Sequence, residues 1–459
     1  MRDDLEVVEI DFKSGIKSLK LKPARVLVLG IAGIILLGGL LLNLPIASKD
    51  GASVGFLNAL FTATSAVSVT GLVVVNTAEH WTVFGKLVII VLIQAGGLGF
   101  MTLATLIALI LGKRIGLRDR LIIQEQLNQF NLSGVVNLAR YVILSTFAIE
   151  LAGAMLLSTS FIPKYGIFKG IAYSLFHSIS AFCNAGFDII GNSMEDFVGD
   201  PVVILTISGL IILGGLGYTV FMEITRNRTY ILKKASLHTK MVFKVNALLL
   251  VSGFVFVMLV EYNNPSTLKI LDFNEKVLAS IFQTVITRTA GFNSVNLGGL
   301  RPATVLFFVI LMFIGGSPSS TAGGIKTTTF GVIMGTLASI VKGKDDVEIM
   351  ERRIPLHLVF RAFAIAIISM TVIITMTMIL TFTEDQVFLD LLFEVTSAFA
   401  TVGVTRGITP ELSGIGKVVI ITTMFIGKVG PLTLAFALAK RHRQYDGKYR
   451  YPEDKLMIG

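Results

Sequence analysis

One short motif occurs four times along the chain, and this repetition constrains the fold more than any other feature. Each copy is an apolar, hydroxyl-rich segment ending in a single glycine, at Gly71, Gly186, Gly291 and Gly403. The glycines are 115, 105 and 112 residues apart, and in every copy a long apolar run precedes the motif and another follows it. The chain is therefore expected to fold as four tandem units of one architecture.

The composition indicates that the chain lies in a lipid bilayer. Hydrophobic residues make up 53% of the chain and charged residues 15%, with a mean hydropathy of +0.77, too apolar for a water-facing surface. A membrane span needs roughly 20 apolar residues. Eight runs reach that length, two per unit: 24–46, 84–112, 139–161, 200–223, 241–262, 302–340, 357–382 and 413–439.

Between the two runs of each unit lies the glycine-ending segment. The four segments are 54–70, 168–185, 274–290 and 387–402. Each is too short to cross the bilayer, so it must enter and return to the same face. Non-helical backbone survives at membrane depth only where protein buries it or where it lines a wet cavity. The sequence thus predicts an all-α integral membrane protein with eight transmembrane helices and four re-entrant pore helices.

The loop charges predict the orientation of the chain. Five segments hold 28 of the 40 Lys and Arg residues: 1–25, 113–140, 225–244, 341–361 and 440–459. They alternate so as to lie on one side, which the positive-inside rule makes the cytoplasm. The prediction is a multi-pass protein of the cytoplasmic membrane with both termini inside. The net charge of +10 then requires no nucleic-acid partner.

The sequence shows no pattern typical of an enzyme. The single cysteine, Cys183, excludes an intramolecular disulfide and a cysteine metal site, and the five histidines lie on different elements. The nearest match to a phosphate-binding loop, at 323–327, has the wrong spacing and lies inside an apolar run. We therefore expect no catalytic residue, no bound cofactor and no metal site apart from potassium at the glycine segments.

The glycine segments have the chemistry of an ion filter. The carboxyl end of a helix carries partial negative charge and favours a cation, and inward carbonyl groups can replace the water shell of an ion. Glycine permits the positive φ that such a strand needs. The segments resemble the T-V-G-Y-G sequence of potassium-channel filters. The candidate filter residues are Val69, Thr70, Gly71, Asn184, Ala185, Gly186, Thr289, Ala290, Gly291, Thr401, Val402 and Gly403.

With these motifs the chain resembles the membrane subunit of the Ktr/Trk/HKT potassium-transporter superfamily, in particular its bacterial Ktr branch. The resemblance covers about residues 22 to 441. It implies a pseudo-fourfold arrangement of the units around one central pore, pairing as a homodimer, and a cytosolic nucleotide-binding ring as regulatory partner. Glycine at all four filter positions implies potassium as the transported ion, and sodium is left open as an activator. The implied ring would dock on basic segments such as 225–240 and 341–353, which equally suit anionic membrane lipid.

The expected organisation is six segments. They are a cytoplasmic segment 1–22, repeat 1 at 23–112, repeat 2 at 113–224, repeat 3 at 225–341, repeat 4 at 342–441, and a cytoplasmic tail 442–459.

The second apolar run of the third repeat is interrupted at 315–329 by glycine, serine, threonine, proline and lysine. Such a stretch cannot face lipid, so it is predicted to line the cavity below the filter as a gate, the alternative being a kinked packing segment. In related transporters this position is an intramembrane gate loop. The candidate gate residues are Gly315, Gly316, Ser317, Pro318, Ser319, Ser320, Thr321, Ala322, Gly323, Gly324, Lys326 and Lys428.

Two lysines are predicted near that level. Lys428 lies in the middle of an apolar run, where a charge is unfavourable by about 2.5 kcal/mol or more unless it faces a cavity or a partner. Relatives usually carry arginine there, and an ammonium group cannot make the forked contacts of a guanidinium. Lys326 either faces the same cavity or extends to the cytoplasmic surface.

Other residues in the apolar runs have packing interpretations. Glycines at 96, 97, 99, 214, 215 and 217 are interpreted as close-packing surfaces of the second helices. Glu150 and Arg288 are expected to pair with neighbours and brace the pore helices, with direct ion binding as the alternative.

Two functional classes fit these features. The first is a gated cation pathway for potassium uptake, and the second is an alternating-access cation symporter, which also uses broken helices at mid-membrane. Symporters use two inverted repeats, whereas this chain has four parallel ones, so the gated pathway is preferred.

Overall fold

The structure is a computed structural model that describes residues 8–10, 19–21, 23–99, 102, 105, 116–126, 135–226, 235–431, 433 and 434. The predicted cytoplasmic tail, 442–459, and most of the segment 1–22 lie outside these residues. Near the start of the chain, β1 (Val8–Ile10) pairs antiparallel with β2 (Leu19–Leu21). A second hairpin joins β3 (Glu348–Ile349) to β4 (Arg352–Arg353).

The described helices repeat one order of elements four times, as a long helix, a short apolar helix and a second helix. The first unit has α1 (Pro23–Leu42), α2 (Phe56–Ser68) and α4 (Val83–Leu98). The second has α7 (Val135–Tyr165), α8 (Ile167–Phe182), α9 (Pro201–Leu216) and α10 (Tyr218–Arg226). The third has α11 (Leu237–Glu261), α12 (Phe273–Ile286), α13 (Pro302–Phe313) and α14 (Thr327–Val341). The fourth has α15 (Leu356–Thr383), α16 (Phe388–Phe399) and α17 (Gly414–Val429).

Short elements connect these helices. They are η1 (Pro45–Ala47), α3 (Thr77–His80), α6 (Leu117–Gln126), η2 (Glu195–Phe197), η3 (Leu297–Gly299) and η4 (Thr409–Glu411). Side-chain caps start three of the second helices, because Thr82, Asp200 and Ser413 each accept a backbone N–H from the first turn of the helix that follows.

The long helices are the membrane spans that length and composition support. Among the described residues, four helices are long and apolar enough to cross a membrane, and they belong to α1, α7, α11 and α15. The second runs differ from the eight full spans predicted. The pair α9 and α10 bends by 95°, while α4 and α13 are short apolar helices. Glycines with a positive φ end three of the second helices, since φ is 79° at Gly99, 92° at Gly217 and 87° at Gly430.

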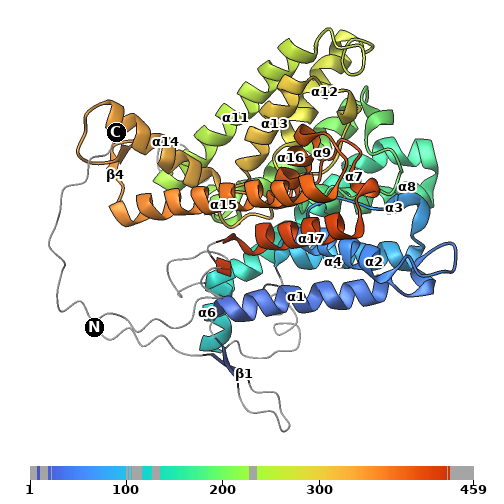
Figure 1. Cartoon of the computed structure of the whole chain (residues 1–459), viewed down its shortest axis with the longest axis horizontal. Helices are drawn as coiled ribbons and strands as arrows, with labels where there is room; N and C mark the ends of the chain where they lie inside the picture. The colour runs from blue at the N-terminus through green and yellow to red at the C-terminus, as the bar shows by residue number, and fades with distance from the viewer. Residues whose placement is uncertain are drawn as a thin grey trace.

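Contacts between the units form a closed ring. Within each unit the long helix packs on the short one, as α1 does on α2, α7 on α8, α11 on α12 and α15 on α16. Between units, each second helix packs on the short helix of the next: α4 on α8, α9 on α12, α13 on α16, and α17 back on α2. In Figure 1 the red α17 accordingly lies beside the blue helices of the first unit. The short helices therefore gather inside the ring.

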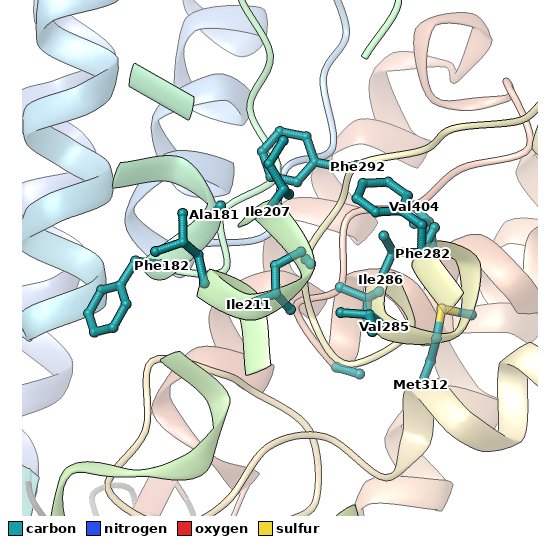
Figure 2. Packing of buried hydrophobic residues seen from close by; sticks show 14 of the residues in the cluster. Ala181, Phe182, Ile207, Ile211, Phe282, Val285, Ile286, Phe292, Met312 and Val404 are labelled. Carbon is teal, nitrogen blue, oxygen red and sulfur yellow. The ribbon is translucent and has the colours of Figure 1, made fainter. Parts of the chain in front are cut away.

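The interior is apolar, and so is the outer surface of the long helices. Figure 2 shows part of the core, a single cluster that includes Phe182 of α8, Ile211 of α9, Phe282 of α12, Met312 of α13 and Val404 of the fourth unit. On the outside, large apolar side chains are exposed along all four long helices, for example Leu37, Leu151, Leu259 and Ile367. An apolar surface of this extent is suited to lipid rather than to water.

Candidate functional site

The four motif glycines follow the short helices in the same strained backbone conformation. Each glycine has a positive φ: 98° at Gly71, 67° at Gly186, 66° at Gly291 and 88° at Gly403. The residue two positions earlier is left-handed as well, at Val69, Asn184, Thr289 and Thr401, with φ between 51° and 71°. For β-branched residues this conformation is a true outlier. Strain of this kind gathers at functional sites.

Helix-capping hydrogen bonds hold this conformation. In three units the residue before the glycine donates its N–H to a carbonyl five residues earlier, which is the pattern of a left-handed helix end. These bonds are Thr70 to Ser65 (2.8 Å), Ala185 to Ser180 (2.7 Å) and Val402 to Ser397 (2.8 Å). In the third unit Ala290 N–H reaches the carbonyl of Ile286 instead, at 3.1 Å.

The serine six residues before the glycine adds a contact that sequence analysis missed. Gly71 N–H donates to Ser65 Oγ and Gly403 N–H donates to Ser397 Oγ, both at 3.0 Å. Ser180 Oγ donates to the carbonyl of Phe187, and Val285 occupies the position in the third unit. The signal was available in the sequence, because serine stands six residues before the glycine in three of the four copies.

The glycines meet one another around the ring. A Cβ added to any of them would press on the carbonyl oxygen of the residue that precedes the glycine of the next unit. These pairs are Gly71 with Ala185, Gly186 with Ala290, Gly291 with Val402, and Gly403 with Thr70. The last pair closes the cycle between the fourth unit and the first. The structure therefore brings all four predicted glycine segments to one place, with four carbonyl groups beside them.

The second helices pack on the carboxyl ends of the short helices through glycine. A Cβ at Gly96, Gly214 or Gly427 would collide with the carbonyl oxygen of the residue four positions before the motif glycine of the same unit. Gly97 faces Cys183 just as closely. The packing interpretation is thus right for Gly96, Gly97 and Gly214. Gly217 ends a helix and also lies against the carbonyl of Pro318, Gly99 ends a helix, and Gly215 makes no close contact of this kind.

Glu150 braces the short helix α8. This buried carboxyl of α7 accepts a hydrogen bond from Gln94 Nε2 of α4 at 3.3 Å, and Cys183 Sγ, at the end of α8, lies 3.7 Å away. The backbone carbonyl of Glu150 also accepts from Ser178 Oγ of α8. Glu150 therefore joins the first two units, as the bracing interpretation expects.

Arg288 has the same bracing role in the third unit. This buried guanidinium follows α12 and donates through Nη2 to Asn246 Oδ1 of α11 at 2.8 Å and through Nη1 to the carbonyl of Ile314. Both partners are protein groups, which supports bracing rather than ion binding.

Two further side-chain pairs beside the motif glycines were missed by sequence analysis. His177 Nε2 lies 2.9 Å from Asp188 Oδ1, and Thr405 Oγ1 donates to Glu394 Oε2 at 2.7 Å. In both pairs one partner lies nine residues before the motif glycine and the other lies two residues after it. The same spacing therefore occurs in the second and the fourth unit. Between the loops of the second and third units, Asn293 Nδ2 donates to Glu195 Oε1 at 2.6 Å, and partial burial raises the pKa of the Glu195 carboxyl.

The interrupted stretch of the third unit forms a loop across the ring. It runs from the end of α13 to Lys326, which caps the start of α14. Ser317 N–H donates to the carbonyl of Gly215 at 3.0 Å, and Tyr218 N–H donates to the carbonyl of Ser319 at 2.9 Å, so the loop is fastened where α9 bends into α10. Ile325 also pairs with Ile314, which holds the two ends of the loop together. The stretch is not helical, and its role as a gate rather than a kinked packing segment stays a prediction.

A cavity of about 260 Å³ lies against this loop. Its walls include loop residues from Ser319 to Lys326, glycines 96, 97, 99, 427 and 430, and the lysine at 428. Val67 and Phe399, each four residues before a motif glycine, also line it. The cavity therefore reaches from the loop to the carboxyl ends of the short helices. Part of the polar backbone of the loop faces this cavity. Non-helical backbone within a membrane protein is expected to be buried by protein or to line a water-filled cavity.

Both predicted lysines line this cavity. Lys326 Nζ donates to the carbonyl of Ala322 within the loop at 2.7 Å, so it faces the cavity rather than extending to the cytoplasmic surface. Lys428 lies near the end of α17, on another wall of the same cavity. The structure thus brings together the predicted filter, loop and lysine residues at one site.

Comparisons with known proteins agree with this geometry. A family profile described as TrkH, cation transport protein, matches residues 34–447. The chain is similar to Ktr system potassium uptake protein B of Bacillus subtilis, with 44% identity over 97% of this chain and 98% of that protein. It is 40% identical to potassium/sodium uptake protein NtpJ of Enterococcus hirae, over 96% of this chain and 98% of that protein.

A solved structure has the same fold. The potassium transporter TrkH from Vibrio parahaemolyticus superposes with a TM-score of 0.72 and 19% identity, covering 91% of this chain and 84% of that one. The chain therefore belongs to the TrkH family of cation transport proteins and is a membrane subunit of the Ktr/Trk type.

Proposed function

We propose that this protein takes up potassium across the cytoplasmic membrane through a gated, channel-like pore. The pore runs through the ring of the four units, and its selectivity filter consists of the twelve residues at the motif glycines. One observation carries the proposal: the carbonyl oxygen before each glycine lies against the glycine of the preceding unit, all the way around the ring. Oxygens gathered in this way can replace the water shell of a dehydrated cation.

The short helices supply the electrostatics of the filter. Each ends a few residues before its glycine, so four carboxyl ends with partial negative charge point at the same place. A monovalent cation is favoured there without a carboxylate ligand. The acids that lie nearby are engaged elsewhere, as Glu150 is with Gln94 and Asp188 with His177.

The loop below the filter is the proposed gate. It lines the cavity together with Lys326 and Lys428, and a cation leaving the filter would have to pass these residues. Two fixed ammonium groups oppose a cation at this point. We infer that conduction requires the loop to move aside, and that Lys428 contributes to the barrier rather than to ion binding.

Similarity to relatives supports the choice of ion. Ktr system potassium uptake proteins and a potassium/sodium uptake protein align with nearly the whole chain. Potassium is therefore the proposed substrate, and sodium is the proposed activator or second ion. The closed ring of four like units supports a pore over an alternating-access symporter, which would be built from two inverted halves.

Regulation and placement follow from the same similarities. The relatives are described as parts of a Ktr system. We propose a homodimer with both termini in the cytoplasm, docked on a cytosolic nucleotide-binding ring through basic segments. Exposed Arg352 and Arg353 of β4 and Lys342 after α14 belong to one such segment.

The test is potassium uptake by cells that lack their own potassium transporters. Cells expressing this chain with the cytosolic ring subunit are expected to grow at low potassium and to accumulate the ion, and repeating the measurement without sodium shows whether sodium is required. Gly186→Val, whose side chain would collide with Gly291, should abolish uptake. Gly209→Val is the matched control, because nothing lies within 4 Å of a Cβ at Gly209. If the parent chain reaches the membrane and no potassium enters, the proposal is wrong.

A further inference from the structure

Asn184 connects the filter to the loop below it. This buried residue stands two positions before Gly186. Its Oδ1 accepts a hydrogen bond from Thr321 Oγ1 of the loop at 2.9 Å, the shortest contact of this hydroxyl, which also lies 3.1 Å from the carbonyl of Gly214 and 3.4 Å from that of Phe182. Thr321 is also buried, and its N–H donates to the carbonyl of Gly214 at 3.3 Å. The threonine is therefore fixed both to α9 and to a filter residue.

The other end of the Asn184 side chain holds the filter strand of the next unit. Nδ2 lies 3.2 Å from the carbonyl of Arg288 and 3.3 Å from Thr289 Oγ1, and these two residues directly precede Ala290 and Gly291. A carboxamide has one acceptor side and one donor side. Because Thr321 occupies the acceptor side, the donor side is turned toward the third unit and toward the carbonyl of Ile211 in α9, 3.3 Å away.

The loop also touches the filter of the fourth unit. A Cβ added to Gly323 would collide with Thr401 Oγ1. It would also lie only 2.7 Å from the carbonyl oxygen of Ala400. Thr401 is buried, and among the described residues its hydroxyl has no hydrogen-bond partner. The loop thus lies directly on the left-handed residues of two filter strands and is linked to a third through Asn184.

We propose that the Thr321 to Asn184 hydrogen bond couples the position of the loop to the conformation of the filter, so that Thr321 sets potassium affinity and ion preference without lining the filter. This rests on the proposed function of the two segments. With the loop in place, Asn184 is oriented and the strands of the second and third units are held together. When the loop leaves, the carboxamide loses its donor and can rotate, which loosens the strand contacts.

Coupling of this kind must be reciprocal. If the loop position changes the affinity of the filter for potassium, then potassium in the filter changes the stability of the docked loop by the same factor. A loop that only obstructs the path would behave differently. Removing one of its hydrogen bonds would change the maximal rate of uptake and leave both the half-saturating potassium concentration and the ion preference unchanged.

Thr321→Val is the test, because it removes the hydroxyl and keeps the shape of the side chain. We expect the half-saturating potassium concentration to rise about two- to tenfold, the range produced by loss of one hydrogen bond, and the ratio of potassium to sodium uptake to fall. Thr321→Ser retains the donor and should behave like the parent. Ser320→Ala is the matched control, since Ser320 Oγ donates to the carbonyl of Ser317 inside the loop. It should alter the maximal rate only.

A second variant tests the same bond from the filter side. Asn184→Gly removes the carboxamide and tolerates the φ of 60° at this position. In that background, Thr321→Val should produce no further change in the half-saturating concentration, whereas independent effects would add. If Asn184→Gly inserts poorly, the comparison of Thr321→Val with Thr321→Ser still decides the coupling.

The outcomes separate the coupling from the function on which it rests. If the parent chain takes up no potassium, the proposed function fails. If the parent transports and Thr321→Val changes only the maximal rate, as Ser320→Ala does, the loop is an obstruction and the coupling is wrong. Full additivity of the two substitutions would overturn it as well.

Discussion

At the residue scale, the motif glycines are required for two separate reasons. Each has a positive φ, and each lies so close to the next unit that even one added carbon would press on a carbonyl oxygen. A substitution must therefore strain the backbone and displace a proposed ion ligand together. Gly209 has neither restraint, whereas Gly217, with a φ of 92° and the carbonyl of Pro318 beside it, shares both.

Serine at the proposed filter is expected to weaken ion preference. In Gly71→Ser or Gly403→Ser the ratio of potassium to sodium uptake should fall about tenfold, equivalent to about 1.4 kcal/mol, because the carbonyl of Ala185 or Thr70 is pushed aside. Uptake of both ions is measured in the same cells, with Gly209→Ser as the control. An unchanged ratio in both filter variants would remove the filter assignment.

Lys428 is expected to slow the ion. It lines the cavity that holds Lys326, so Lys428→Ala should speed potassium flux about two- to tenfold, equivalent to ~0.4–1.4 kcal/mol of barrier. Lys428→Arg should slow flux, since a forked guanidinium can make more hydrogen bonds to the loop. Lys417→Ala is the matched control, because this lysine of the same helix donates to Asn58 Oδ1 away from the cavity. Loss of transport in a correctly inserted Lys428→Ala protein would instead identify a structural role.

At the element scale, the second helices combine two uses of glycine. Gly96, Gly214 and Gly427 let α4, α9 and α17 approach the carboxyl ends of the short helices, and Gly99, Gly217 and Gly430 then end those helices near the cavity. The short helices are thereby supported next to the strained filter strands. The third unit departs from this scheme, since a loop with its own glycines replaces the helix end.

Alanine at the packing glycines should destabilise the protein. Gly96→Ala, Gly214→Ala or Gly427→Ala places a methyl group against a backbone carbonyl that cannot easily move, and we expect a loss of about 1–3 kcal/mol. Thermal unfolding of the detergent-solubilised protein measures the effect. Gly209→Ala should be neutral or slightly stabilising. Equal melting temperatures for all four variants would show that the close approach is not needed.

Shortening the loop should increase flux. Gly315 and Gly324 lie next to each other, so deleting residues 317 to 323 can be bridged without moving α13 or α14. Uptake by the deletion variant should be faster than that of the parent and less dependent on the cytosolic subunit. A variant that inserts normally and transports no faster would show that the loop is not a gate.

At the scale of the whole molecule, the ring explains how an apolar chain holds a polar path. Long helices with exposed leucine and isoleucine form the outer surface, while the short helices and the strained strands face inward. Acidic and basic residues also lie in different loops. Loops that follow the short helices carry acids such as Asp196, and the β3–β4 hairpin carries Arg352 and Arg353.

The proposed orientation can be tested by labelling. In a Cys183→Ser background, the Asp196→Cys variant should react with a membrane-impermeant thiol reagent in intact cells, and the Asp345→Cys variant only after the membrane is opened. Both positions are exposed in the structure, whereas Cys183 is buried and should remain unlabelled in the parent chain. Labelling of the Asp345→Cys variant in intact cells would reverse the assignment of the cytoplasmic side.

Much of the fold and site could be predicted from the sequence because the signals are local. A glycine after a short hydroxyl-rich segment, repeated at similar intervals, locates Gly71 and its three counterparts, and a polar stretch inside an apolar run locates the loop. The breaks at Gly99 and Gly430 could not be predicted, since glycine is common in straight membrane helices too.

What the sequence determined by itself is the membrane setting, the fourfold repeat and the residue types at the filter and loop, because hydropathy, spacing and backbone freedom depend on neighbours along the chain. Only the tertiary structure decided that Gly403 meets Thr70, that Lys326 turns into the cavity, and that Asn184 joins Thr321 to the third unit. Those partners lie more than one hundred residues apart in two of the three cases. Contacts over such separations depend on how the helices close into a ring, which no local pattern specifies.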